Sequence, residues 1–134
     1  MKHNIPIYGT PVAGPCPSEM VEMASFFNRL RKEYPEYARI ALHIRNEGLR
    51  SAMQVRKIKS DGGFVKGASD VIIPGSPTFV MEMKSTSKNA KISLEQVEYL
   101  EAAEAMGAFV CVAIGAVGAW KAFNTWINSS KKGM

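Results

Sequence analysis

Three charged residues stand in an otherwise apolar stretch, and their types and spacing suit phosphodiester chemistry. Asp70 precedes the apolar run 71–73, while Glu82 and Lys84 lie two residues apart at the end of the next apolar run. Residues two apart on a β-strand point to the same face, and charged side chains are costly to bury without a partner. Two carboxylates and an ammonium group that meet at one point would suit a divalent cation, with Lys84 beside the attacking water.

The residues alone leave two interpretations of these charges open. In a hydrolytic site, Asp70 and Glu82 would bind Mg²⁺ or Mn²⁺ through their oxygen atoms, and the backbone carbonyl of Met83 would add another oxygen. Lys84 would orient or deprotonate the attacking water, or offset the charge that develops on the phosphorus centre. In a purely structural site, Glu82 and Lys84 would form a buried ion pair, and Asp70 would cap the start of a strand.

The pattern around these charges predicts a β-hairpin with strands at 69–73 and 78–84. Only a pairing in which the residue numbers sum to an even total, such as Asp70 opposite Glu82, puts both carboxylates on one side. This register leaves a five-residue loop, 74–78, which is within the usual range for hairpins. The opposite face is then entirely apolar and consists of Val71, Ile73, Phe79, Met81 and Met83.

Two other positions are candidates for the same site. Glu19 and Glu22 are three residues apart on a predicted helix, so they can face the same side, and we favour Glu19 as a further metal ligand. Acidic residues in a first helical turn also suit the helix dipole, without any ligand role. Gln96 follows Ser93 at the spacing of a capping box, and it is also placed to reach the attacking water or the scissile phosphate.

The positive charge of the chain is concentrated in one segment. The 134 residues carry a net charge of +5, and residues 45–66 hold six basic and two acidic side chains, or +4. A basic segment near an acidic site predicts a polyanionic substrate, although a solvated basic helix face is the alternative. Contacts with backbone phosphates are expected from Arg50, Arg56, Lys57 and Lys66. An acidic stripe is expected to turn away from nucleic acid; it consists of Glu95, Glu98, Glu101 and Glu104.

Several classes of protein are disfavoured by the composition. No apolar run approaches the roughly 18 residues of a membrane span, and the polar N-terminus does not resemble a signal peptide, so a cytoplasmic protein is expected. Cys16 and Cys111 are predicted to be reduced thiols. With two histidines in the chain, a His-based metal site is not expected, and the segment 115–118 lacks the lysine and spacing of a phosphate loop.

The elements that position these residues predict one α/β domain with a mixed sheet of about four strands. Residues 1–17 are expected to form an irregular arm, residues 18–128 the domain, and residues 129–134 a frayed tail. The predicted helices are 18–33, 49–60, 93–107 and 117–128, and the strands outside the hairpin are 40–44 and 109–114. A polar, mobile loop is expected at 85–92. Three aromatic residues of the last helix are expected in the core or at a dimer contact: Trp120, Phe123 and Trp126.

In their order along the chain, these motifs resemble the VRR-NUC family of the PD-(D/E)xK nuclease superfamily. The resemblance covers about residues 18–127. It departs from the family pattern at Ser69, where many relatives have Pro, and at Glu22, where Gln is common. The matching motifs are an early helix with a Glu, Asn46-Glu47-Gly48, Gly67-Ala-Ser-Asp70, Glu82-Met-Lys84, Ser93-x-x-Gln96 and Gly107-Ala-Phe109-Val110.

The resemblance implies a fold with a restriction-endonuclease-like core and a Mg²⁺- or Mn²⁺-dependent endodeoxyribonuclease of phage or prophage type. It also implies a homodimer that nicks branched DNA such as Holliday junctions. By position, Glu19, Asp70 and Glu82 correspond to the metal carboxylates, Lys84 to the catalytic lysine and Gln96 to a supporting glutamine. Restriction-like or exonuclease activity on linear DNA is one alternative, and a non-catalytic nucleic-acid-binding module is another.

Overall fold

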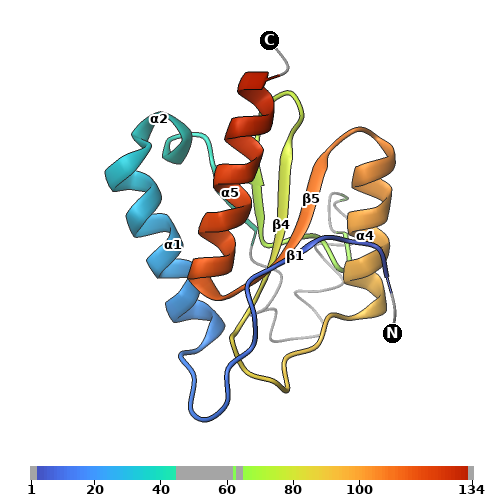
Figure 1. Ribbon diagram of the computed structural model, residues 1–134. Helices are drawn as coiled ribbons and strands as arrows, with labels where there is room; N and C mark the ends of the chain where they lie inside the picture. Colours follow the sequence, from blue (N-terminus) through green and yellow to red (C-terminus); the bar gives the residue numbers. More distant parts are fainter. Residues whose placement is uncertain (1–2, 45–61, 63–64, 133–134) are drawn as a thin grey trace.

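The computed structural model describes residues 3–44, 62 and 65–132. Within this part of the chain, five strands and four helices are formed (Figure 1). The strands are β1 (Ile7–Tyr8), β2 (Leu42–His43), β3 (Val71–Ile73), β4 (Phe79–Lys84) and β5 (Phe109–Ile114). The helices are α1 (Glu19–Glu33), α2 (Pro35–Ala38), α4 (Leu94–Ala105) and α5 (Gly115–Lys132).

The strands form one mixed sheet in the order β1-β5-β4-β3-β2. β4 lies at the centre, antiparallel to β3 and parallel to β5. The outer strands continue this division, because β2 is antiparallel to β3 and β1 is parallel to β5. The predicted α/β domain with a mixed sheet is confirmed, with five strands in place of about four.

Helices cover both faces of the sheet. α1 and α5 pack together on one face, and α4 lies on the other (Figure 1). Alternate residues of β4 therefore enter two different cores: Met81 and Met83 join the cluster under α1 and α5, while Val80 joins Leu100 of α4. A strand that is buried on both faces is expected to be apolar along its length, and this makes the buried Glu82 exceptional.

The hairpin forms with the predicted register. Val71 pairs with Met81, Ile72 with Val80 and Ile73 with Phe79. Each pair sums to 152, the register in which Asp70 lies opposite Glu82, and residues 74–78 connect the two strands. The apolar face predicted for the hairpin is fully buried. A slip of one residue would turn these side chains to the opposite face and would separate Asp70 from Glu82.

Aromatic side chains fill the core between the sheet and α5. Phe123 and Trp126 are buried and Trp120 is half-buried, and all three pack in the cluster beneath α1 and α5. The indole Nε1 of Trp126 donates a hydrogen bond to the carbonyl of Pro77 at 2.8 Å. These three residues, the aromatic stripe of α5, therefore belong to the core, which is one of the two roles that the sequence left open.

The N-terminal arm is more ordered than predicted. Ile7–Tyr8 form an edge strand beside β5, and the amide of Val112 donates to the carbonyl of Pro6 at 2.9 Å. The expectation of an irregular arm over residues 1–17 is wrong at this strand. Two residues are too few to show a period in the sequence, and the pairing exists because β5 offers an open edge.

The ends of several other elements differ from the prediction. α5 begins at Gly115 and ends at Lys132, so it takes in residues that were expected to form a frayed tail. α2 was not predicted, and the strand expected at 40–44 is limited to Leu42–His43. The helix expected at 49–60 lies outside the described residues. No helix in the described part of the chain has the length and apolarity needed to cross a membrane.

Candidate active site

The hairpin delivers Asp70, Glu82 and Lys84 to the end of β4 from which the chain leaves toward α4. The backbone carbonyl of Asp70 accepts a hydrogen bond from the amide of Ile44 at 2.7 Å, which ties it to the strand next to β3. Its carboxylate Oδ2 accepts from the amide of Met83 at 2.8 Å. These two bonds hold the Asp70 side chain over β4, beside Glu82.

The two carboxylate oxygens of Glu82 have different surroundings. Glu82 is only 2% exposed. Its Oε2 accepts a hydrogen bond from Gln96 Nε2 at 3.1 Å and lies 3.9 Å from Nζ of Lys84. Its Oε1 is buried and has no hydrogen-bond partner among the described residues. A buried oxygen without a partner is costly, so this atom favours a ligand that the described residues do not provide.

The electrostatics of the site favour a proton or a cation on Glu82. Burial raises the pKa of Glu82 to about 10, with further contributions from the neighbouring Asp70 carboxyl group and from the charge of Glu19. The Lys84 ammonium lowers the pKa but does not outweigh these effects. Two adjacent carboxyl groups resist carrying two negative charges, and a divalent cation would remove that resistance.

Gln96 combines the two roles that the sequence presented as alternatives. The side-chain Oε1 of Gln96 accepts a hydrogen bond from the backbone amide of Ser93 at 2.9 Å. The backbone amide of Gln96 donates to Ser93 Oγ at 3.1 Å, which completes the capping box of α4. Its Nε2 is left free by this arrangement and donates to Glu82. One side chain therefore holds the first turn of α4 and Glu82 together.

Gly67 lets the chain before Asp70 lie directly against this turn. Its φ of +82° is unfavourable for residues with a Cβ. A Cβ atom placed there would lie 2.4 Å from the carbonyl carbon and oxygen of Glu95 and 2.8 Å from the amide nitrogen of Gln96. The glycine of the Gly-x-x-Asp motif thus allows Asp70 and Gln96 to reach the same site.

Glu19 and Glu22 serve different parts of the structure. The negative charge of Glu19 contributes to the raised pKa of Glu82. Glu22 Oε1 instead accepts from the amide of Ala116 at 3.1 Å, at the N-terminus of α5, where a carboxylate suits the helix dipole. Sequence reasoning missed this link, because nothing local relates a residue of α1 to one that is 94 positions away.

The other predicted residues have varied outcomes. The Met83 side chain is buried in the core, so only its backbone is available to the site, and its amide already bonds to Asp70. Lys66 is exposed, and its Nζ lies 3.3 Å from Glu95 Oε1. Three of the four predicted phosphate contacts, Arg50, Arg56 and Lys57, lie outside the described residues.

Two cavities involve candidate residues of the site or their sequence neighbours. One is about 350 Å³ and includes Lys66, Asp70 and Gln96 in its lining. The other is about 470 Å³ and lies between the N-terminal arm and the chain that follows β4, with Glu19 and Ser85 among its lining residues. Asp70 and Gln96 therefore line one cavity and Glu19 lines the other, while Glu82 itself is buried.

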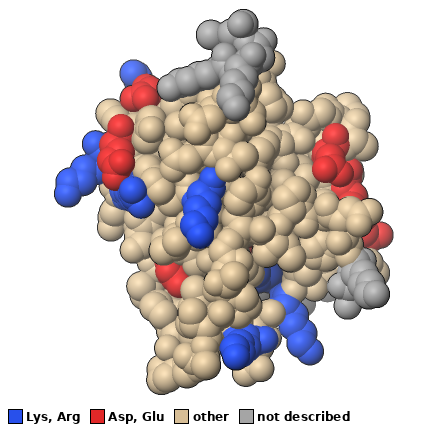
Figure 2. Space-filling model, viewed as in Figure 1, with Lys and Arg blue, Asp and Glu red and all other residues tan. Residues whose placement is uncertain are grey.

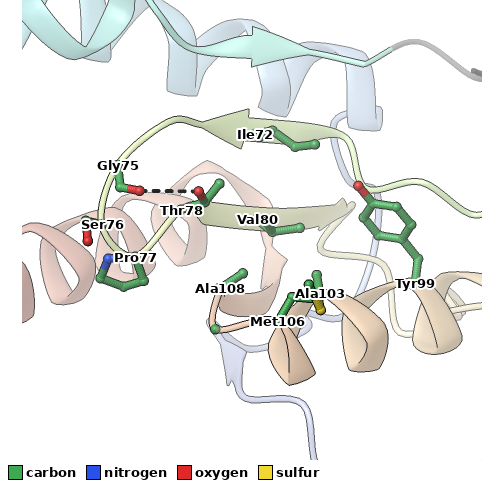
Figure 3. A pocket seen from close by; sticks show the side chains of 11 residues that line it. Ile72, Gly75, Ser76, Pro77, Thr78, Val80, Tyr99, Ala103, Met106 and Ala108 are labelled. Atoms are coloured by element: carbon green, nitrogen blue, oxygen red, sulfur yellow. Dashed lines mark hydrogen bonds between the residues drawn. The ribbon is translucent and has the colours of Figure 1, made fainter.

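A third cavity, of about 500 Å³, lies beside the turn of the hairpin and the C-terminal half of α4 (Figure 3). Thr78 Oγ1 donates to the carbonyl of Gly75 at 3.3 Å within that turn. Tyr99 is the one ionisable residue among those that line it, and Tyr99 packs with the apolar cluster under α4. This cavity lacks the charged groups that the carboxylate site has.

The donor set fits a divalent cation held by a pair of carboxylates. Among residues 3–44, 62 and 65–132, no three His, Cys, Asp or Glu side chains lie close enough together to hold a metal ion on their own. Mg²⁺ is commonly bound by one or two carboxylates, with water and substrate phosphate oxygens as the other ligands. The pair of Asp70 and Glu82, with its buried and unpartnered Oε1, meets that requirement.

Comparison with known proteins supports the fold. No protein-family model and no curated protein matches the sequence. A solved structure described as a "VRR_NUC domain protein" is similar to this chain with a TM-score of 0.71, over 87% of this chain and 92% of that chain, at 18% sequence identity. The resemblance seen in the sequence motifs is thereby confirmed at the level of fold. The chain has the fold of a VRR_NUC domain protein.

Proposed function

We propose that this protein is a divalent-metal-dependent DNA endonuclease that hydrolyses phosphodiester bonds. The observation that carries the proposal is the buried Glu82, next to Asp70 and Lys84, with one carboxylate oxygen that no described residue satisfies. The fold shared with a VRR_NUC domain protein supports the same conclusion. Neither observation depends on the other, since one concerns single atoms and the other the course of the backbone.

Each residue has a separate task in this proposal. Asp70 and Glu82 bind Mg²⁺ or Mn²⁺, and the Met83 carbonyl is a candidate for one more oxygen. Glu19 does not lie close enough in the described structure to complete a three-carboxylate group with this pair, so as a further ligand it would have to move toward the ion with the start of α1. The bound ion supplies Lewis-acid stabilisation of the charge that develops during in-line displacement at phosphorus. Lys84, whose side chain is only 11% exposed, orients the attacking water and takes up or offsets charge. Gln96 keeps Glu82 oriented toward the ion.

We extend the proposal to branched DNA, such as a Holliday junction, cut by a homodimer in the cytoplasm of a host cell that carries phage or prophage genes. A symmetric dimer would present two copies of the site to two strands of a junction. The aromatic stripe of α5 is buried in the core of the chain, so such a dimer would use another surface. Analytical ultracentrifugation of the protein, with and without a four-way junction, tests this assembly.

Cleavage assays test the activity itself. Purified protein, stripped of metal with EDTA, is mixed with Mg²⁺ or Mn²⁺ and either a four-way junction or a linear duplex of the same sequence. We expect nicks in the junction and little cutting of the duplex. Preferential cutting of the duplex would replace branch selectivity with a restriction-like or exonuclease activity. Binding without any cutting would favour a non-catalytic module.

Lys84→Ala is the decisive variant for the catalytic assignment. Removal of the ammonium group should lower cleavage by at least about 100-fold, the usual scale for loss of a proton-transfer or charge-stabilising group, and leave DNA binding within a few-fold. Lys121→Ala, on the exposed face of α5, is the matched control and should cut like the wild type. Undiminished cleavage by Lys84→Ala would remove Lys84 from the mechanism.

A further inference from the structure

The chain between β4 and α4 contributes to the cavity that contains Glu19 and to the cavity that contains Asp70. We call residues 85–93 the connecting segment. It starts directly after Lys84, and Ser85 and Ser87 line the cavity on the Glu19 side. It ends at Ser93, which lines the cavity that contains Asp70 and Gln96. The connecting segment therefore leads from the cavity that contains Glu19 to the cavity that contains Asp70 and Gln96.

Hydrogen bonds give the first half of this segment a defined shape. The amide of Ala90 donates to the carbonyl of Ser87, and the amide of Asn89 donates to Ser87 Oγ, both at 3.1 Å, so residues 87–90 form a tight turn. The amide of Val12 donates to the carbonyl of Thr86 at 2.8 Å, and Val12 and Ser87 form an isolated bridge. The N-terminal arm thus holds the segment in place beside the site.

The connecting segment carries two lysines that pair with nothing else in the described structure. Lys88 lies in the turn and Lys91 three residues later; both are exposed, and neither forms an ion pair with a described residue. By contrast, Lys66 and Lys84 both face carboxylates. Figure 2 shows basic side chains at the lower edge of the molecule, where Figure 1 places this segment, and acidic side chains on the side of α4.

We propose that the connecting segment is the track along which the phosphodiester backbone of the cleaved strand lies. Lys88 and Lys91 bind phosphates beside the one that is cut, and the cavity lined by Ser85 and Ser87 holds an adjacent nucleotide. This inference rests on the proposed nuclease function and adds the path of the substrate.

Charge reversal at these two lysines tests the track. Lys88→Glu/Lys91→Glu is compared with Lys32→Glu/Lys121→Glu, a control at two exposed sites on α1 and α5. Each double variant lowers the net charge by four, from +5 to +1, so any difference comes from position. Binding of the same DNA is measured over a range of salt with Ca²⁺ in place of Mg²⁺, and cleavage is measured with Mg²⁺.

We expect the reversal at 88 and 91 to weaken binding at least about 10-fold and to make log Kd versus log salt shallower by about 1.4–1.8, the effect of two lost phosphate contacts. KM should rise while kcat stays within about threefold. Lys88→Ala/Lys91→Ala, a milder change, should lower the salt dependence in the same direction. Circular dichroism and thermal unfolding confirm that each variant is folded.

The outcomes separate this inference from the proposed function. If the wild type neither binds nor cuts DNA, the proposed function fails and the track falls with it. If the wild type cuts DNA and both double variants lose affinity equally, the loss is caused by the lower net charge. In that case the proposed track is wrong and the nuclease assignment stands. A large effect on kcat alone would also overturn the track, because backbone contacts outside the scissile group act mainly on binding.

Discussion

Glu82 determines the chemistry available at the end of β4, because its two carboxylate oxygens have different surroundings. One oxygen faces Gln96 and Lys84, and the other is buried without a partner in the described structure. A carboxyl group in this position is stable when it carries a proton or binds a cation. Its ionised, metal-free form is the unfavourable state, and this has consequences for stability as well as for activity.

The first consequence concerns the pH dependence of folding without metal. The pKa of Glu82 is raised from 4.5 to about 10 on folding, so the stability that it contributes is present below about 4.5 and is lost as the pH rises toward the folded-state pKa. We expect the free energy of unfolding in EDTA to fall across this range by up to about 1.4 kcal/mol per pH unit. Urea unfolding at a series of pH values measures this fall in the free energy of unfolding.

Glu82→Gln keeps the shape of the side chain and cannot ionise. This variant should not cleave DNA. Its free energy of unfolding in EDTA should vary much less with pH than that of the wild type, and it should be more stable than the wild type in EDTA at neutral pH. Glu101→Gln, at an exposed position on α4, is the control and should retain the slope of the wild type. A Glu82→Gln protein that loses stability with pH as steeply as the wild type would show that another group dominates.

At the scale of elements, α4 is tied to the sheet by a residue that also caps it. Ser93→Ala removes one half of the capping box, and Gln96→Ala removes the other half together with the bond to Glu82. Both should lower stability by about 1 kcal/mol. Only Gln96→Ala should also lower kcat, by about 10-fold. Thermal unfolding and cleavage rates, measured side by side, distinguish capping from positioning; equal loss of activity in both would mean that Gln96 acts through the cap alone.

The approach of the Gly67 loop to α4 supports a second prediction at this scale. Gly67→Ala should destabilise the protein by about 2 kcal/mol or more, because the new Cβ meets backbone atoms of Glu95 and Gln96 that cannot rotate away. Gly107→Ala is a matched control, since Gly107 also has a positive φ, +99°, but its added Cβ meets nothing within 4 Å. Chemical denaturation of both variants separates the close contact from backbone strain; equal losses would argue against the contact.

For the whole molecule, metal binding and folding are coupled. A cation that binds only the folded chain should raise the free energy of unfolding by about 2.7 kcal/mol at 100 times its Kd. The gain should shrink as the pH is lowered, because Glu82 must release its proton to bind the ion. Differential scanning calorimetry with Mn²⁺ and with EDTA at two pH values measures this. Asp70→Asn should lose most of the gain; retention of the full gain would place the ion elsewhere.

Several features of this protein are determined by the sequence itself. The positions of the charged and apolar residues in the hairpin determine its register, since a slip of one residue would turn Met81 and Met83 to the opposite face and separate Asp70 from Glu82. The spacing of Ser93 and Gln96 determines the start of α4, because both hydrogen bonds of a capping box are local. The charges at 70, 82 and 84 were predicted to meet for the same reason, since the positions of all three follow from one hairpin.

Only the tertiary structure decided what depends on contacts between distant parts of the chain. In the sequence both Glu19 and Glu22 are candidate ligands, with Glu19 favoured. In the structure α1 packs against α5, Glu22 bonds to the amide of Ala116, and the charge of Glu19 raises the pKa of Glu82. The edge strand Ile7–Tyr8 exists because β5 accepts it, more than 100 residues away. Local periodicity in the sequence does not predict such pairings, because they form only when the sheet and its covering helices come together.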